Sequence, residues 1–521
     1  MTSIKKLINP HKPLRPFFLI LCMLSFAILS SCSKEKDEVE PGSENGNNTA
    51  SISIDSLTSS SGTAEGNAGI AANADDLLAN ATFSSKVIIN FGTTLTVINP
   101  LPGAGVTVTQ ANGDVTVNST VADVEYELSG TTANGSVKIY SDKKIKLTLN
   151  GVNITNADGP AINIQSSKRV FLVLADNTTN SLTDGATYTA SGTEDMKATL
   201  FSEGQLVFSG AGSLNIKANY KHAICSDEYV RVISGNIKVT GAVSDGIHTN
   251  DAFIVDGGII NITTAGDGIQ CEEGYIVINN GAFTISAADK GIAATWDTDK
   301  TIDPYLTING GTINITSSGG EGIETKSIMT INNGTITTKT SDDGLNAGTF
   351  IYINGGNIYA YSTSNDAIDS NGKITVTGGK VVAIGSTAPE EGFDCDKNTF
   401  KITGGILVGA AGATSSPTAS VSTQASVILG SGIANQLYHI RTSDDKEVLT
   451  FLIPRNYATM LFSSPKLKSS GTYKVYTGGS ITGGSHFGGV YTSGTYNTET
   501  QESTFTTNNM VTKIGGSIGP G

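Results

Sequence analysis

The feature of this sequence that most constrains its fold is an internal repeat of about 22 to 23 residues. Its first column is a small residue followed by a large apolar one: Ala223-Ile224, Gly246-Ile247, Gly268-Ile269, Gly291-Ile292, Gly322-Ile323, Gly344-Leu345, Ala367-Ile368 and Gly392-Phe393. Its second column is a glycine: Gly235, Gly258, Gly281, Gly311, Gly334, Gly356, Gly379 and Gly405. Both columns advance in step, including one long repeat with an insertion at residues 296–304. A fixed period of this length predicts a stacked repeat architecture.

Within each repeat, apolar and polar residues alternate. Tyr275-Ile276-Val277-Ile278 leads through Asn280-Gly281 to Phe283-Thr284-Ile285. Alternation of period two predicts short strands, and a glycine between them predicts a corner with positive φ. A unit this short buries its apolar face only by stacking on its neighbours. We therefore predict an all-β chain, a parallel β-helix, rather than a leucine-rich horseshoe, which lacks its Leu/Asn signature here, or a propeller, whose blades need about 40 residues.

The repeat also sets the predicted domain boundaries. Earlier rungs are expected at Leu147–Ile154 and Leu206–Gly210, and Val87–Ile89 and Val106–Val108 are expected to cap the amino-terminal end. The β-helix is thus predicted over residues 84–413. Residues 425–521 contain further strand patterns and are predicted to form a β region that covers the open carboxyl-terminal end, because an uncovered last rung invites edge-to-edge association.

The first 31 residues have the pattern of a secretory signal peptide. Lys5, Lys6, Lys12 and Arg15 precede an apolar run from Phe17 to Leu29, too short for a stable membrane span. The end, Leu29-Ser30-Ser31-Cys32, is similar to a bacterial lipobox, in which Cys32 becomes the acylated first residue. The Gly/Ser/Asn-rich stretch 32–80 is predicted to be a disordered tether. We expect an outer-membrane lipoprotein, exposed at the cell surface and anchored to the membrane through Cys32.

The charge of the chain excludes a basic nucleic-acid binder. There are 33 basic and 47 acidic residues, a net charge of −14, and removal of the four basic residues before Cys32 leaves 29 against 47, or −18. An acidic excess points away from phosphate partners and towards cations. We expect no nucleic-acid partner, and a monomer.

Acidic residues recur beside the small–apolar column. The position before it is acidic in six of eight repeats, and acids also occur just after it. Adjacent rungs lie about 4.8 Å apart, so stacked carboxylates repel one another unless a cation lies between them, and Ca²⁺ takes six to eight oxygen ligands. A solvated acidic corner serving the turn is the alternative. The predicted Ca²⁺ ligands are Asp245, Asp267, Glu321, Glu324, Asp342, Asp343, Asp366, Asp369, Glu390, Glu391 and Asp394.

A third column holds small residues, including Cys271 and Cys395, and is predicted to face inwards. Cys225, Cys271 and Cys395 are too far apart in the stack for a disulfide and are predicted to be buried free thiols.

Catalytic motifs are sparse, and no catalytic residue is assigned. Trp296 and Tyr305 flank the inserted segment and are candidate sugar contacts, because aromatic faces stack on sugar rings. Lys290 interrupts the acidic column, so it is a candidate sugar contact, a candidate base for elimination from uronic acids beside Ca²⁺, or simply a balance to the acidic charge. Lys326, close to Glu324, is likewise either a candidate base or a balance to the acidic charge.

Several segments together resemble a known family. They are Lys221–Asp227, Ser244–Ile247, Asp342–Asn346, Asn365–Gly372, Lys197–Gly204 and Leu147–Ile162. They are similar to the bacterial carbohydrate-binding domain-containing proteins built on a right-handed parallel β-helix. Over residues 84–413 the resemblance implies calcium sites on the helix and binding of cellulose or acidic pectin such as polygalacturonate. It also implies a fold like that of pectate lyases, with binding rather than catalysis as the role.

Three functions remain open from the sequence. The first is a surface lipoprotein whose calcium-loaded β-helix binds acidic polysaccharide. The second is a calcium-dependent polysaccharide lyase, which unsaturated products from polygalacturonate would reveal. The third is a structural adhesin in which Ca²⁺ only stiffens the solenoid. We favour the first.

Overall fold

The computed structural model describes residues 51–54, 61–70, 73–296, 298–498 and 501–519. The predicted signal peptide and the lipidation site Cys32 lie outside them. Apart from two short 3-10 helices, η1 (Ala74–Asp76) and η2 (Leu78–Asn80), the regular elements of the described residues are all β-strands. None of the helices in this part of the chain is long and apolar enough to cross a membrane.

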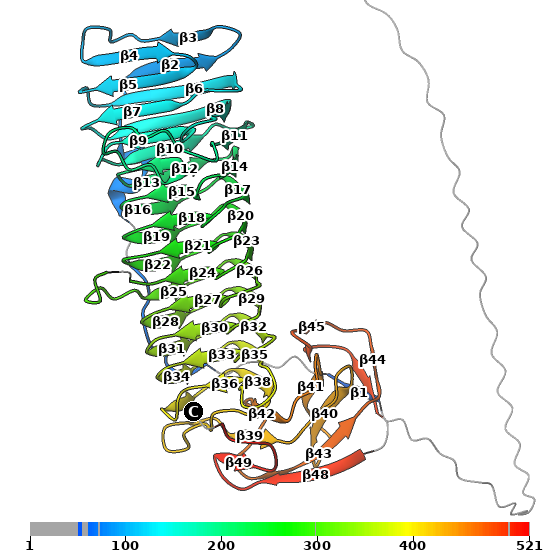
Figure 1. The fold of residues 1–521 in the computed structure, drawn as a ribbon. Coiled ribbons are helices and arrows are strands. Elements are labelled where there is room, and N and C mark those ends of the chain that lie inside the picture. Colours follow the sequence, from blue (N-terminus) through cyan, green and yellow to red (C-terminus); the bar gives the residue numbers. More distant parts are fainter. Residues whose placement is uncertain (1–50, 55–60, 71–72, 297, 499–500, 520–521) are drawn as a thin grey trace, which may run out of the picture. The chain divides into compact units, whose positions relative to one another are not determined.

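The main body is a parallel β-helix with three faces, as predicted (Figure 1). Sheet 1 has 13 strands, of which the first two form an antiparallel hairpin. Its strands are β4 (Val106–Ala111), β5 (Asp114–Ser119), β7 (Val137–Ser141), β9 (Ile162–Gln165), β12 (Ala198–Ser202), β15 (His222–Ser226), β18 (Ile247–Thr249), β21 (Ile269–Cys271), β24 (Ile292–Ala294), β27 (Ile323–Thr325), β30 (Leu345–Ala347), β33 (Ile368–Ser370) and β36 (Phe393–Asp394).

The second face, sheet 2, begins at an antiparallel hairpin and continues in parallel. Its strands are β3 (Leu95–Ile98), β2 (Ser85–Phe91), β6 (Val124–Thr132), β8 (Ile145–Thr155), β10 (Val170–Leu174), β13 (Leu206–Gly210), β16 (Tyr229–Val232), β19 (Ala252–Val255), β22 (Tyr275–Ile278), β25 (Leu306–Ile308), β28 (Ile328–Ile331), β31 (Phe350–Ile353), β34 (Lys373–Val376) and β37 (Phe400–Ile402).

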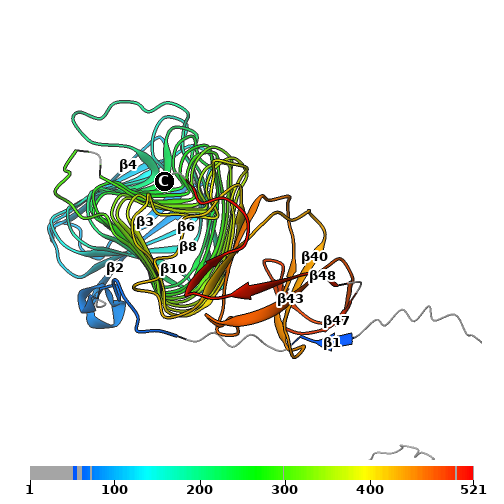
Figure 2. The same ribbon diagram turned by 90° about the horizontal axis from the view of Figure 1, so that it is seen from below.

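The third face, sheet 3, branches from the long strand β8. Its further strands are β11 (Thr179–Thr183), β14 (Ser213–Lys217), β17 (Asn236–Gly241), β20 (Ile259–Thr264), β23 (Ala282–Ala287), β26 (Thr312–Ser317), β29 (Thr335–Thr340), β32 (Asn357–Ser362), β35 (Lys380–Ile384) and β38 (Ile406–Ala411). Figure 2 looks along the stack and shows the faces arranged around the interior of the β-helix. One continuous apolar core fills this interior.

Both repeat columns of the sequence are confirmed. Each apolar residue of the first column pairs with the next, from Ile224 with Ile247 to Ile368 with Phe393, so one apolar row runs down the inside of sheet 1. All eight glycines of the second column have positive φ. The small third column is buried, and Cys225, Cys271 and Cys395 are buried free thiols, as predicted.

The carboxyl-terminal region packs on one side of the last rungs. Strand β42 (Thr459–Ser463) pairs antiparallel with β38 and with β39 (Ser426–Leu429), so it covers the edge of the last strand of sheet 3. An apolar cluster that includes Val382 and Val408 joins the outer face of sheet 3 to strands of this region. The remaining strands are β40 (Leu437–Thr442), β41 (Glu447–Leu452), β43 (Gly471–Thr477), β44 (Ser480–Thr482), β45 (His486–Phe487), β46 (Val490–Tyr491), β47 (Thr495–Asn497), β48 (Gln501–Thr507) and β49 (Val511–Lys513).

The predicted tether needs correction where the structure describes it. Strand β1 (Ser51–Ser53) pairs with β47. Residues 61–70 and 73–82, the N-terminal strap, lie lengthwise along sheet 2. The backbone N–H of Gly62 donates to the Thr377 carbonyl (2.6 Å), and Asp76, fully buried, forms ion pairs with Arg169 (2.8 Å) and Arg231 (2.7 Å). Hydrogen bonds and ion pairs, rather than apolar burial, hold this polar segment in place.

A row of asparagines receives the strap. Along one corner of sheet 2 each side-chain amide donates to the next: Asn309 to Asn279, Asn332 to Asn309, and Asn354 to Asn332, each at 2.8 Å. The same amides also donate to carbonyl groups of the strap, as Asn354 does to Glu65 (2.8 Å).

Candidate functional site

The acidic residues of the repeat gather at the corner that leads into sheet 1 and on the outer face of that sheet. Residues that precede the small–apolar pair occupy the corner. Residues that follow it, such as Asn346, Asp369 and Asp394, are in register on adjacent strands β30, β33 and β36. The stacking predicted from the sequence therefore brings acids of successive rungs side by side.

Part of this acidic column serves the turn itself. The backbone N–H of Asp267 donates to Oδ1 of Asp245 (3.0 Å), that of Lys290 to Oδ1 of Asp267 (2.8 Å), and that of Asp366 to Oδ1 of Asp343 (3.1 Å). Each of these three acids thus accepts the backbone amide of the next rung through one carboxylate oxygen.

The acidic cluster lies at the last of these rungs. We use this name for Asp342, Asp343, Asp366, Asp369, Glu390, Glu391 and Asp394. Oxygens of Asp366, Asp369 and Asp394 lie within 4.8 Å of one another. No lysine or arginine of the described residues forms an ion pair with any member of the cluster.

Burial makes charge on this cluster costly. It raises the pKa of Asp343 and Glu391 to about 8 and the pKa of Asp366 and Asp369 to about 7, and neighbouring carboxylates of the cluster add to each shift. The Asn346 amide bridges Asp343 (2.9 Å) and Asp369 (2.8 Å), but it is neutral. Such a group of oxygens has the composition of a Ca²⁺ site, and oxygens on opposite sides of one Ca²⁺ lie up to about 5 Å apart.

The predicted ligands Glu321 and Glu324 form a separate group. Glu324, 1% exposed at its side chain, pairs with Lys290 (2.7 Å) and with Lys326, and Glu321 lies 4.0 Å from Lys290. Burial disfavours the charged form of Lys290, but Glu324 and Glu321 outweigh it and raise the pKa of Lys290. A lysine held in this charged state is a poor general base, so the pairing favours charge balance over elimination chemistry.

Asp245 lies among histidines rather than among acids. Its Oδ2 is 3.1 Å from Nδ1 of His222 and 3.0 Å from Nδ1 of His248, and Nε2 of His248 is 3.1 Å from Glu272. Burial opposes the charge of Asp245, but the two histidines outweigh it and lower its pKa. Burial likewise opposes charge on His248, whereas Asp245 and Glu272 raise its pKa to about 9. Burial lowers the pKa of His222. Asp267 lies one rung on, and burial raises its pKa to about 7.

The three predicted sugar contacts lie at two different corners of the β-helix. Lys290 precedes β24, whereas Trp296 follows it and forms a β-bridge with Glu273. Tyr305, half-buried, stacks on Tyr275 with ring centroids 4.9 Å apart and planes 4° apart. Trp296 and Tyr305 therefore border the insertion, while Lys290 belongs to the opposite corner.

A second aromatic pair was missed in the sequence. Tyr220, 42% exposed, stacks on Tyr188 with centroids 4.1 Å apart, and Tyr188 donates to Asp184 (2.7 Å). The two tyrosines lie on different rungs and outside the repeat columns. The repeat therefore gave no signal that they would stack.

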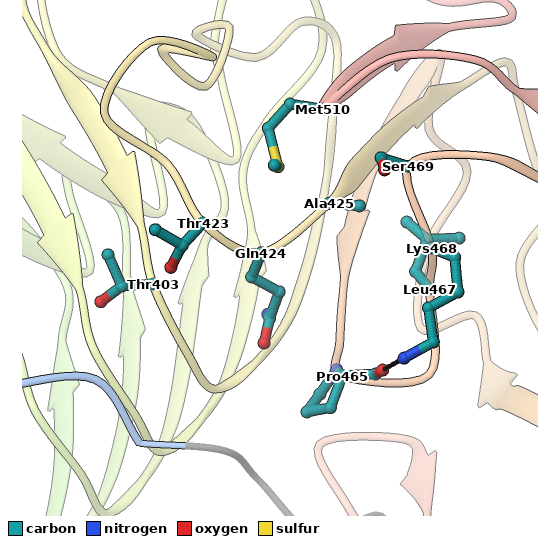
Figure 3. Close-up of a pocket in the computed structure, with 9 residues that line it drawn as sticks. All are labelled: Thr403, Thr423, Gln424, Ala425, Pro465, Leu467, Lys468, Ser469 and Met510. Carbon is teal, nitrogen blue, oxygen red and sulfur yellow. Dashed lines mark hydrogen bonds between the residues drawn. The ribbon is translucent and has the colours of Figure 1, made fainter.

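Two cavities beside the carboxyl-terminal region lack acidic lining residues. Figure 3 shows one of about 320 Å³ between the end of the β-helix and the carboxyl-terminal region. Its one charged lining residue, Lys468, donates to the Pro465 carbonyl (3.0 Å). Another, of about 440 Å³, is lined by Lys339, Tyr359 and Phe487 among others.

Comparison with known proteins identifies relatives of the β-helix. A family model described as carbohydrate-binding domain-containing protein matches residues 111–392, which are 282 of 521 residues. A carbohydrate-binding domain-containing protein of Acetivibrio thermocellus is 34% identical over 118 residues, which cover 22% of this chain and 41% of that relative. The chain thus matches about two fifths of the length of that relative.

A solved structure is also similar. It is the polysaccharide lyase-like protein from C. thermocellum, as a gadolinium derivative, with 24% identity, a TM-score of 0.39, and coverage of 50% of this chain and 93% of its own. The family model, in contrast, spans more than half of this sequence. This protein belongs to the family of carbohydrate-binding domain-containing proteins.

Proposed function

We propose that this protein binds an acidic polysaccharide through Ca²⁺ held on the outer face of sheet 1. The observation that carries the proposal is the convergence of Asp366, Asp369 and Asp394 within 4.8 Å, with no basic partner among the described residues. Ca²⁺ takes more oxygens than these three supply. Carboxylates of a uronate chain would provide the remaining ligands, so the ion would join protein and sugar.

The ligand class follows from charge. The mature chain, at −18 by the predicted processing, repels a polyanion unless a cation intervenes. A polygalacturonate-like chain carries the carboxylates that Ca²⁺ prefers, and a neutral cellulose-like glycan lacks them. We therefore propose a uronate polymer, rather than a neutral glycan, as the ligand. We also propose that Trp296, on the loop after β24, contacts the same polysaccharide.

The cellular setting is part of the same proposal. The lipobox-like sequence at Cys32 would anchor the protein in the outer membrane, facing outwards. A surface lipoprotein of this kind would hold polysaccharide at the cell.

The test is binding of the purified protein to polygalacturonate, cellulose and a panel of other glycans, with Ca²⁺ or with EGTA. We expect binding to polygalacturonate in Ca²⁺ and its loss in EGTA. Asp369→Asn and Asp394→Asn should weaken it at least tenfold, about 1.4 kcal/mol. Asp289→Asn is the matched control, because Asp289 is an exposed acid at the same corner three rungs away.

Other outcomes would replace the proposal. If neither EGTA nor the cluster variants weaken binding of the sugar, the sugar binds to another surface of the protein. Unsaturated uronides formed from polygalacturonate and abolished by chelator would indicate a lyase. Absence of binding to uronates and β-glucans, with binding to another glycan or a protein, would indicate an adhesin.

A further inference from the structure

We propose that His222, Asp245 and His248 form a binding site for a divalent transition metal of the Zn²⁺ class, distinct from the acidic cluster. The site lies at the start of strands β15 and β18 in sheet 1. It goes beyond the proposed polysaccharide binding and does not depend on it.

The ligand atoms are already arranged around one point. Nδ1 of His222 and Nδ1 of His248 lie 3.1 Å and 3.0 Å from the same oxygen, Oδ2 of Asp245. All three atoms lie within 4.8 Å of one another. Ligands at 2.0–2.1 Å from a tetrahedral Zn²⁺ are about 3.3 Å apart. The two nitrogen–oxygen distances are therefore within a few tenths of an ångström of those in a tetrahedral site, and a fourth position would be left for water.

Neighbouring groups hold the ligands in orientation. Nε2 of His248, the nitrogen not facing the proposed ion, is 3.1 Å from Oε2 of Glu272. A carboxylate on the far nitrogen of a ligating histidine is a common support of metal sites. Oδ1 of Asp245 accepts the backbone N–H of Asp267 (3.0 Å), which leaves Oδ2 directed at the histidines.

The repeat explains why two histidines meet here. Ile224 pairs with Ile247 and Cys225 with His248, so His222 stands one rung above Asp245 in the corner column. The two imidazole rings stack with centroids 4.2 Å apart. His222 is 2% exposed, and its Nε2 has no hydrogen-bond partner among the described residues, so its polar contacts lie on the side of Asp245.

The donor set selects the metal class. Imidazole nitrogen suits Zn²⁺, Cu²⁺ and Ni²⁺, whereas Ca²⁺ prefers oxygen ligands alone. Asp245, which the sequence suggested as a calcium ligand, is thereby assigned to a mixed nitrogen and oxygen site. The alternative is a hydrogen-bonded group of His248 between Asp245 and Glu272 that takes no metal.

The experiment is titration of the EDTA-treated, dialysed protein with Zn²⁺, followed by calorimetry, and with Co²⁺, followed by its visible spectrum. We expect one equivalent of Zn²⁺ and a spectrum of four-coordinate Co²⁺. His222→Ala and His248→Ala should lose at least 100-fold in affinity. Glu272→Gln, at a side chain 37% exposed, should fold normally and lose about 10- to 100-fold.

Two controls separate this site from the calcium proposal. His486→Ala removes an exposed histidine in the carboxyl-terminal region and should leave Zn²⁺ binding unchanged. Asp369→Asn should lower Ca²⁺ affinity and leave Zn²⁺ affinity unchanged. Absence of Zn²⁺ binding by the native protein, or equal binding by Glu272→Gln and both histidine variants, would overturn the assignment. Calcium-dependent sugar binding would be unaffected by that result.

Discussion

Replacing Asp369 by asparagine should change the stability of the protein in a way that depends on both pH and calcium. Asp369 lies in the acidic cluster, close to Asp366 and Asp394, and burial followed by the charges of those neighbours raises its pKa to about 7. Its ordinary pKa is about 3.9. The folded protein therefore binds this proton more tightly than the unfolded chain does.

The sign follows from that difference. Between about pH 4 and pH 7 the folded state carries more protons than the unfolded state, so the free energy of unfolding falls as pH rises. A shift of about three pKa units corresponds to about 4 kcal/mol once the group is ionised in both states. Without calcium, Asp369→Asn should raise the free energy of unfolding by about 2 to 4 kcal/mol at pH 8 and by about 1 kcal/mol at pH 4.5.

Calcium should largely cancel this difference in stability at pH 8. Wild-type protein should gain about 2.7 kcal/mol when Ca²⁺ is at 100 times its dissociation constant, whereas the variant should gain much less. Urea unfolding followed by circular dichroism, at both pH values and with EGTA or Ca²⁺, measures these differences. Asp289→Asn should behave like wild type. A variant that is less stable than wild type in EGTA at pH 8, and equally stabilised by Ca²⁺, would refute the reasoning.

Three further predictions concern the scaffold. Gly322→Ala places a methyl group 2.5 Å from the carbonyl oxygen of the next rung and should lower the free energy of unfolding by about 1 to 3 kcal/mol; Gly241→Ala, with open space around it, should not. Lys290→Met should cost about 2 kcal/mol, because Glu324 stays buried beside a single remaining lysine. Asp76→Asn should loosen the N-terminal strap and speed its cleavage by protease, because the half-buried Arg169 loses its carboxylate partner and the buried Arg231 keeps only Asp256.

Each of these has a result that would contradict it. Equal unfolding curves for the two glycine variants would mean that the rungs can separate locally at little cost. Lys300→Met, at an exposed lysine of the insertion, is the control for Lys290→Met, and equal stability of the two would show that Glu324 needs only one partner. Cleavage of the Asp76 variant at the wild-type rate would mean that the asparagine amides and the pair of Glu65 with Lys401 are enough to hold the strap.

The β-helix could be predicted from the sequence because its signal is repeated. Every rung carries the same alternation and the same glycine corner. The neighbouring rungs therefore indicate the same register for Ile247 or Gly258. The strap could not be predicted in this way. Its residues are polar and are held by amides such as Asn332 and Asn354, and hydropathy carries no information on such partners.

The sequence predicted which acidic residues stack on adjacent rungs, but not the partners of their side chains. The columns place acids of adjacent rungs together, which is why Asp366, Asp369 and Asp394 converge. Which neighbour a long side chain reaches depends on its rotamer and on the corner it leaves from. The pairing of Lys290 with Glu324, and the turn of His222 towards Asp245, therefore emerged only from the structure.

The N-terminal strap has a consequence for the order in which the chain can fold. In a solenoid, contacts join neighbouring repeats, so rungs can form one after another as the chain is synthesised. The strap instead bonds to Asn354 and Lys401, which follow Glu65 by 289 and 336 residues. The surface that the strap contacts is incomplete until those rungs exist, so the strap is made first but docks among the last segments. Once docked, the strap contacts rungs about 40 Å apart, at about 4.8 Å per rung. Local unfolding of the rungs at one end of the strap should therefore weaken its contacts with the rungs at the other end.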